Sequence, residues 1–109
     1  MQPSKIGKDV LIVDDNVDAA HCVALLLSIK GHLTRVVHDG RACLAEVQAR
    51  CPQIVLLDLG MPEMDGFETA RELRKLPGGE GILLVALTGW GQDEDRRRTK
   101  EAGFNHHLI

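Results

Sequence analysis

Three aspartates at the ends of apolar segments are the residues in this sequence best suited to chemistry. Asp14 and Asp15 come directly after the apolar residues 10–13, and Asp58 comes directly after residues 54–57. An unpaired buried charge is costly, so carboxylates at the ends of buried strands are seldom there for packing. If the two segments are neighbouring parallel strands, their carboxyl ends converge into an acidic pocket suited to a hard divalent cation.

The elements that would position these aspartates alternate between strands and helices. Apolar runs predict strands over residues 10–13, 54–57 and 82–87, β-branched residues predict a short strand over 33–37, and residues 104–109 are expected to start a fifth strand. Helical patterns predict helices over about 17–30, 41–50, 66–76 and 93–102. Asn16 and Asp65 are placed to cap helices, and Gly31 is placed to end one. This alternation predicts a doubly wound, five-stranded parallel α/β sheet. Ligands of such sheets bind outside the carboxyl ends of the strands, which brings Thr88 to the three aspartates.

The helices are expected to cover the sheet with aliphatic side chains. The inner face of the first helix is expected to carry Val17, Ala20, Val23, Ala24 and Leu27. In the second helix, Ala42, Leu44, Ala45 and Val47 are the candidates. The three cysteines form no Cys-x-x-Cys pair, so they are expected to be reduced and mostly buried.

Length and composition limit the class of protein. A chain of 109 residues with 44% hydrophobic and 27% charged residues suits one packed domain over residues 1–109. The net charge of −3 argues against a nucleic-acid-binding domain. No apolar run approaches the length needed to span a membrane, and the first residues lack the pattern of a signal peptide. A cytoplasmic protein without membrane contact is therefore expected.

The aspartates and the residues around them resemble the receiver domain of two-component response regulators. Asp14-Asp15 is similar to the acidic pair after the first strand of that family, and Asp58 to its phosphoacceptor. Met61-Pro62-x-Met64-Asp65-Gly66 is similar to the loop after the acceptor, and Thr88 to the Ser/Thr after the fourth strand. The sequence around Thr88, residues 86–91, is also similar to that of receivers fused to sensor histidine kinases. The resemblance implies the flavodoxin-like topology of receivers.

The resemblance implies phosphoryl transfer from a phosphohistidine to Asp58, assisted by Mg²⁺. The expected metal ligands are Asp14, Asp15, Asp58 and the backbone carbonyl of Gly60, with Asp14 acting largely through water. The Thr88 hydroxyl would donate to a phosphoryl oxygen. The partner would be a histidine kinase or a histidine phosphotransfer domain, and the domain itself would not be an enzyme.

Two further residues have both a functional and an ordinary interpretation. Trp90 would shield the phosphoryl group from water, or would be only a loop aromatic that touches a partner or nothing. His107 stands where the family has an aromatic residue that rotates on activation, or is a static strand residue. The fourth helix and fifth strand could also serve in dimerisation.

The family pattern continues after the fifth strand with Lys-Pro and a last helix, which would stand beyond Ile109. We therefore expect a receiver domain truncated at its C-terminus. A degenerate receiver, used only for docking or dimerisation, is the main alternative. A phosphatase of the haloacid type would need a second carboxylate where Gly60 stands, and a flavodoxin-like cofactor domain would need a phosphate-binding loop in place of Asp14-Asp15.

Overall fold

The computed structural model describes residues 7–59, 66–87, 97 and 100–108. The strands are β1 (Asp9–Val13), β2 (Leu33–Val37), β3 (Ile54–Asp58), β4 (Leu83–Leu87) and β5 (His106–Leu108). The helices are α1 (Val17–Ile29), α2 (Gly40–Ala49) and α3 (Gly66–Lys75), with a short 3₁₀ turn, η2 (Gly79–Gly81), before β4. Residues 97 and 100–102 are also helical, within the span predicted for a fourth helix.

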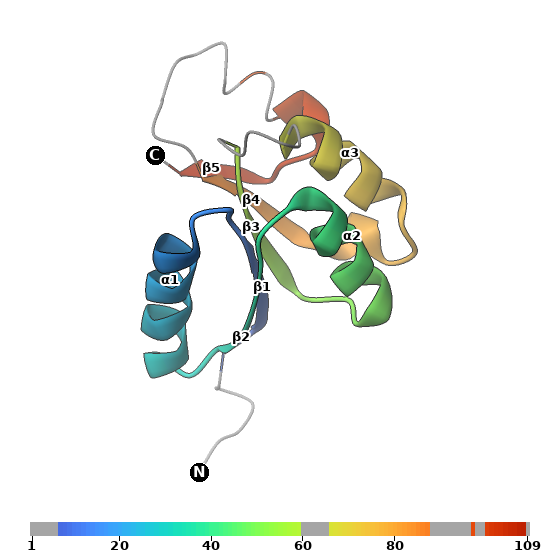
Figure 1. Ribbon diagram of the computed structural model, residues 1–109. Helices are drawn as coiled ribbons and strands as arrows, with labels where there is room; N and C mark the ends of the chain where they lie inside the picture. The colour runs from blue at the N-terminus through green and yellow to red at the C-terminus, as the bar shows by residue number, and fades with distance from the viewer. Residues whose placement is uncertain (1–6, 60–65, 88–96, 98–99, 109) are drawn as a thin grey trace.

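The strands form a parallel sheet in the order β2-β1-β3-β4-β5. Figure 1 shows α1 on one side of this sheet and α2 and α3 on the other. The predicted doubly wound α/β fold is therefore confirmed. The strand order changes direction between β1 and β3, because the chain first winds outward to β2 and then returns to the centre.

The larger core lies between the sheet and the pair α2 and α3. It joins inward side chains of all the central strands to those of both helices: Leu11, Val13, Cys43, Val47, Val55, Leu57, Phe67, Ala70, Leu73, Leu84 and Ala86. A smaller cluster on the opposite side packs Val10 and Ile12 of β1 against Ala20 of α1. Burial on both faces explains why β1 is a continuous aliphatic run instead of an alternating one.

Three expectations about buried residues are wrong. Val17 is 47% exposed, because it is the first residue of α1 and lies beyond the part of the helix that covers the sheet. In α2, Ala45 is exposed, whereas Cys43, which was not among the predicted inner residues, is buried. The expectation that the cysteines are mostly buried is wrong as well, because Cys43 is buried whereas Cys22 and Cys51 are exposed.

The outer surface of α1 is apolar as well. Leu25, Leu26 and Ile29 are 62%, 62% and 73% exposed. None of the helices in the described part of the chain has the length and hydropathy needed to cross a membrane.

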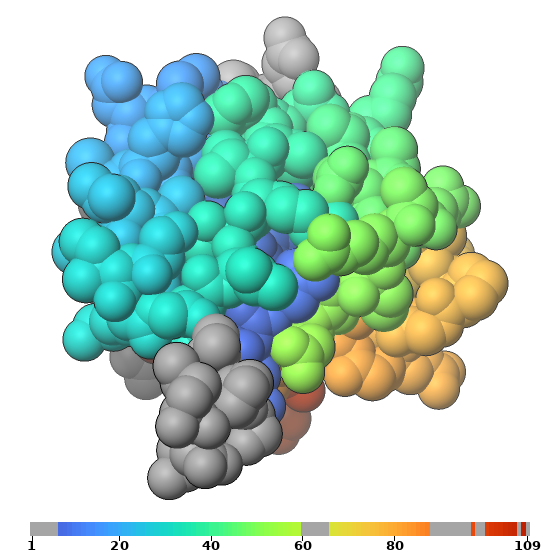
Figure 2. Space-filling model, turned by 90° about the horizontal axis from the view of Figure 1, so that it is seen from below, coloured from blue at the N-terminus to red at the C-terminus, as the bar shows by residue number. Residues whose placement is uncertain are grey.

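A cavity of about 450 Å³ opens at the amino ends of the strands. Lys8, Cys51, Gln53, Gly78 and Leu83 are among the residues that line it. Figure 2 shows this end of the molecule, where the blue start of β1, the green segment before β3 and the orange segment before β4 meet. The cavity is thus at the end of the sheet opposite to the three aspartates.

Candidate functional site

The register of β1 and β3 places the predicted aspartates side by side. Val13, the last residue of β1, pairs with Leu57 of β3. The next residue on each strand path is an aspartate, Asp14 on one and Asp58 on the other. Asp58 belongs to β3 itself, where it pairs with Leu87 of β4, rather than following the strand as the sequence suggested. A cluster at the carboxyl edge of the sheet follows directly from this pairing.

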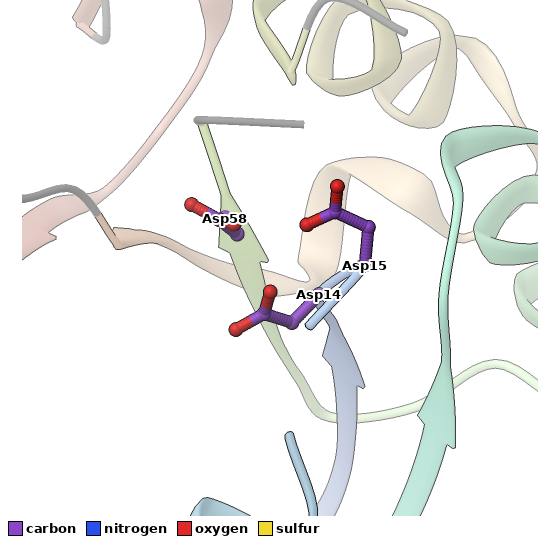
Figure 3. Close-up of side chains that lie close together, drawn as sticks. All are labelled: Asp14, Asp15 and Asp58. Atoms are coloured by element: carbon purple, nitrogen blue, oxygen red, sulfur yellow. The ribbon is translucent and has the colours of Figure 1, made fainter. Parts of the chain in front are cut away.

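The carboxylates of Asp14, Asp15 and Asp58 come together in one cluster. Each offers an oxygen atom, and these three atoms lie within 4.8 Å of one another. Asp14 and Asp58 are partly buried, and Asp15 is exposed. Figure 3 shows Asp58 on the end of β3 and the other two side chains on the segment after β1, with their carboxylates near that of Asp58.

Local hydrogen bonds fix the segment that carries Asp14 and Asp15. The Asp14 backbone N–H donates to the carbonyl of Val37 at 3.1 Å, which ties it to the end of β2. Its carboxylate accepts the Asn16 backbone N–H at 3.0 Å. The Asn16 side chain in turn accepts the Ala19 N–H at 3.0 Å and caps α1, as the sequence predicts. The acidic pair is therefore held between a strand end and a helix cap.

His38 is a neighbour of this site that the sequence analysis did not single out. Its Nδ1 lies 3.0 Å from the backbone carbonyl oxygen of Asp14, and its ring makes an edge contact with that of His21. Its position directly after β2, the strand beside β1, could have indicated this contact. His38 supports the backbone of the acidic pair rather than its carboxylates.

The donor set of the cluster fits a hard cation. All three side chains offer carboxylate oxygens, the ligands that Mg²⁺ and Mn²⁺ prefer, and the cluster has no histidine or thiolate ligand that would favour zinc. Within the described ranges, neither Asp14 nor Asp15 forms an ion pair with a lysine or arginine. Their negative charge is thus available to a metal ion.

The other predicted site residues lie outside the described part of the chain. These are Gly60, Thr88 and Trp90, together with the residues 61–65 that resemble the loop after the acceptor. The backbone of His107 is described as the middle residue of β5, but the orientation of its side chain is outside the description as well. Their proposed roles remain predictions.

Comparison with known proteins identifies relatives across nearly the whole chain. The family "Response regulator receiver domain" matches residues 10–109. The DNA-binding response regulator MtrA of Mycolicibacterium paratuberculosis is 37% identical over 100 residues, which make up 92% of this chain and 43% of MtrA. This chain therefore spans less than half the length of that curated relative.

Solved structures agree with this relationship. The chemotaxis protein CheY4 of Vibrio cholerae superposes with a TM-score of 0.89 at 28% identity, covering 92% of this chain and 83% of CheY4. The Mn²⁺-bound form of the response regulator Rcp1 superposes with a TM-score of 0.82, also at 28% identity, over 94% of this chain and 81% of Rcp1. Fold, acidic edge and sequence match thus lead to one conclusion: the chain belongs to the response regulator receiver domain family of two-component systems.

Proposed function

We propose that Asp58 is the residue that accepts a phosphoryl group from a phosphohistidine of a histidine kinase or a histidine phosphotransfer domain. The observation that carries this proposal is the convergence of three carboxylate oxygens within 4.8 Å at the carboxyl edge of the sheet. Asp58 is the central member, because it ends the strand between β1 and β4. An acceptor there is accessible from the edge and fixed by the sheet on both sides.

The transfer needs an anionic acceptor to meet an anionic donor. A carboxylate oxygen of Asp58 would form the new P–O bond as the P–N bond to the donor histidine breaks, so in-line alignment of the two groups is essential. The strand pairing of Asp58 fixes the direction of its backbone, and the N–H of Leu59 donates to the Leu87 carbonyl at 2.9 Å. These contacts with β4 hold the backbone of Asp58 and of the residue that follows it.

Mg²⁺ is the cofactor that we propose for this site. Asp14, Asp15, Asp58 and the backbone carbonyl of Gly60 would hold it, with Asp14 acting largely through water. The bound ion would neutralise the charge that three carboxylates and a phosphoryl group bring together. The Mn²⁺-bound form of Rcp1, a response regulator of the same fold, supports the binding of a divalent ion.

The Thr88 hydroxyl is proposed to donate to a phosphoryl oxygen of modified Asp58. The support is the register, because Leu87, directly before Thr88 in the sequence, pairs with Asp58. Trp90 is proposed to shield the phosphoryl group from water, and His107 to respond to it. For both residues, the ordinary interpretations given above remain the competing ones.

The wider setting is also a proposal. We infer that residues 1–109 act as a single receiver domain that lies in the cytoplasm. A hybrid sensor histidine kinase is one candidate for the protein to which the domain belongs. The domain would bind no nucleic acid and make no membrane contact. Dimerisation would use the fourth helix and the fifth strand. In this setting the domain would assist its own phosphorylation and dephosphorylation without being an enzyme.

The phosphoacceptor role can be tested by chemical phosphorylation. Incubation of the chain with Mg²⁺ and acetyl phosphate is expected to add one phosphate to the intact mass. Asp58→Asn should abolish this adduct, because an amide oxygen is a far weaker nucleophile than a carboxylate. Asp18→Asn is the matched control: Asp18 is an exposed aspartate in the first turn of α1, outside the cluster, and its replacement should leave the adduct intact.

Two outcomes would count against the proposal. An adduct that persists in Asp58→Asn would move the acceptor to another residue. A wild-type chain that folds and takes up no phosphate would instead favour the docking module.

A further inference from the structure

Arg74, near the end of α3, binds two separate segments of the chain, residues 79–82 and residues 103–105. Its Nη1 donates to the carbonyls of Gly79 and Ile82, both at 2.7 Å, on the way into β4. Its Nε and Nη2 donate to the carbonyl of Gly103 at 2.9 and 2.6 Å. Nη2 also donates to the side-chain oxygen of Asn105 at 2.7 Å, directly before β5. These bonds use all five N–H donors of a guanidinium.

In the part of the chain that the structure describes, the hydrogen-bond acceptors of Arg74 are neutral oxygens, which is unusual for a guanidinium. Four backbone carbonyls, including that of Glu80 at 3.4 Å, and one amide oxygen surround it. Burial lowers the pKa of Arg74, and the nearby carboxylate charge of Glu80 opposes this effect only in part. The hydrogen bonds of Arg74 thus serve mainly to hold the backbone of the two segments that it contacts.

The contact between Arg74 and Asn105 reaches the β4–β5 pairing itself. The Asn105 side-chain oxygen that accepts from Arg74 also accepts the backbone N–H of Leu84 at 2.8 Å. The Asn105 backbone N–H donates to the Leu84 carbonyl at 2.7 Å. The regular register of Val85 with His106 begins at the next residue pair. Arg74 therefore holds the side chain that starts the alignment of β5 on β4.

Gly103 shows that the fit around Arg74 is close. Its φ of 104° lies in the left-handed region, and a Cβ added there would lie 3.0 Å from the Cγ of Arg74. Glycine is thus required both by the backbone and by the packed arginine stem. In Figure 1 the red helical turn before β5 lies beside α3, as these contacts require.

The opposite end of α3 packs against the proposed acceptor. A Cβ added at Gly66, the first residue of α3, would lie 3.4 Å from the backbone carbonyl oxygen of Asp58 and 3.2 Å from the Cα of Leu59. One helix of ten residues thus lies against the acceptor strand with its first turn and holds the segment directly before β5 through its last turn. A short, hydrogen-bonded helix moves largely as a unit.

We infer that Arg74 is a positioning residue that fixes β5 on β4 and couples β5, through α3, to the state of Asp58. This inference rests on the proposed function for the part that concerns coupling. The positioning of β5 stands on the hydrogen bonds alone. Lysine cannot replace Arg74 here, because its three donors on one nitrogen cannot reach the acceptors on both segments at once.

Hydrogen exchange measured by mass spectrometry on the full chain tests both parts, in a peptide that contains residues 104–108. In Arg74→Lys we expect this peptide to exchange at least about tenfold faster than in the wild type, because local opening loses several charge-assisted bonds. Peptides from α1 and β2 should not change. Lys75→Gln is the matched control, since Lys75 is the next residue and, among the described residues, its ion pair is with Glu72 on the surface.

Acetyl phosphate with Mg²⁺ adds the test of coupling. The wild type should change exchange in residues 104–108 when Asp58 is phosphorylated. Arg74→Lys should take up phosphate and lose that change. If the wild type takes up no phosphate, the proposed function fails, whereas the positioning of β5 is still decided by exchange without the donor.

A second pair of variants covers the case in which Arg74→Lys does not fold. Asn105→Ala removes the acceptor, and Asn105→Asp keeps an oxygen in its place. Fast exchange in Asn105→Ala with protection retained in Asn105→Asp is expected. The positioning role is overturned if Arg74→Lys, or Asn105→Ala in its stead, exchanges as slowly as the wild type. Coupling is overturned if phosphorylated wild type shows no change in this peptide, or if phosphorylated Arg74→Lys shows the same change as the wild type.

Discussion

Cys43 illustrates how a single core residue links the fold to pH. Its side chain has no exposed surface, and burial, with a smaller effect of the nearby Asp39 charge, raises the pKa of the thiol from about 9 to about 12. Above pH 9 the unfolded chain loses this proton while the folded chain keeps it. The stabilisation is therefore complete below the lower value and is lost as pH rises toward the higher one.

We predict that Cys43→Ala weakens the loss of stability between pH 9 and 11. One retained proton contributes at most about 1.4 kcal/mol per pH unit to the free energy of unfolding, and the alanine variant lacks this contribution. Urea unfolding at several pH values measures the slope. The exposed Cys51 provides the control Cys51→Ala, which should keep the wild-type slope. Equal slopes in all three proteins would contradict the assignment.

At the same scale, the acidic cluster could be predicted from the sequence but the support of Arg74 could not. Asp14 and Asp58 each follow a strong strand pattern, and parallel neighbours bring such positions together. The acceptors of Arg74 are backbone carbonyls and one amide, scattered between residues 79 and 105. Sequence pattern carries no information about which carbonyls a distant guanidinium will meet.

Among the elements, α1 depends on a cap that also borders the site. Asn16 has an extended backbone with φ of −82° and ψ of 104°, and its side chain satisfies the N–H of Ala19. We predict that Asn16→Ala lowers the free energy of unfolding by about 1 kcal/mol, since a free helix N–H is left without its acceptor. Asn16→Ser should restore most of the loss, and chemical denaturation measures both. A serine variant as unstable as the alanine variant would argue against capping.

The elements also show where prediction from sequence reached its limit. The central residues of the predicted strands are confirmed as strand residues. The aliphatic runs of four to six residues among them are typical of buried strands. The buried faces of the helices were predicted less accurately, as in α2, where Ala45 is exposed and Cys43 is buried. Alanine carries little information about burial, so the inner face depends on neighbours that the helix meets only after folding.

For the whole molecule, ion binding and folding should be linked. The three carboxylates come together only when β1 and β3 pair, so a divalent ion should bind the folded chain far better than the unfolded one. We predict that Mg²⁺ at a hundred times its dissociation constant raises the free energy of unfolding by about 2.7 kcal/mol. Addition of a chelator should reverse this effect in thermal unfolding.

Asp15→Asn is the variant that tests this linkage. It removes the charge of the exposed member of the cluster and keeps its shape, so most of the Mg²⁺-dependent stabilisation should disappear. Asp18→Asn should respond to Mg²⁺ as the wild type does. Equal stabilisation of Asp15→Asn and wild type would place the bound ion elsewhere.

The acidic cluster and the anchoring of β5 come from different parts of the chain, which has a consequence for protein engineering. All three clustered aspartates precede Leu59, whereas Arg74 and all its acceptors follow it. Chimaeras of two receivers joined after β3 would therefore inherit the acidic cluster from one parent and the anchoring of β5 from the other. The seam that such a chimaera must preserve is the pairing of β3 with β4, from Ile54 with Leu83 to Asp58 with Leu87.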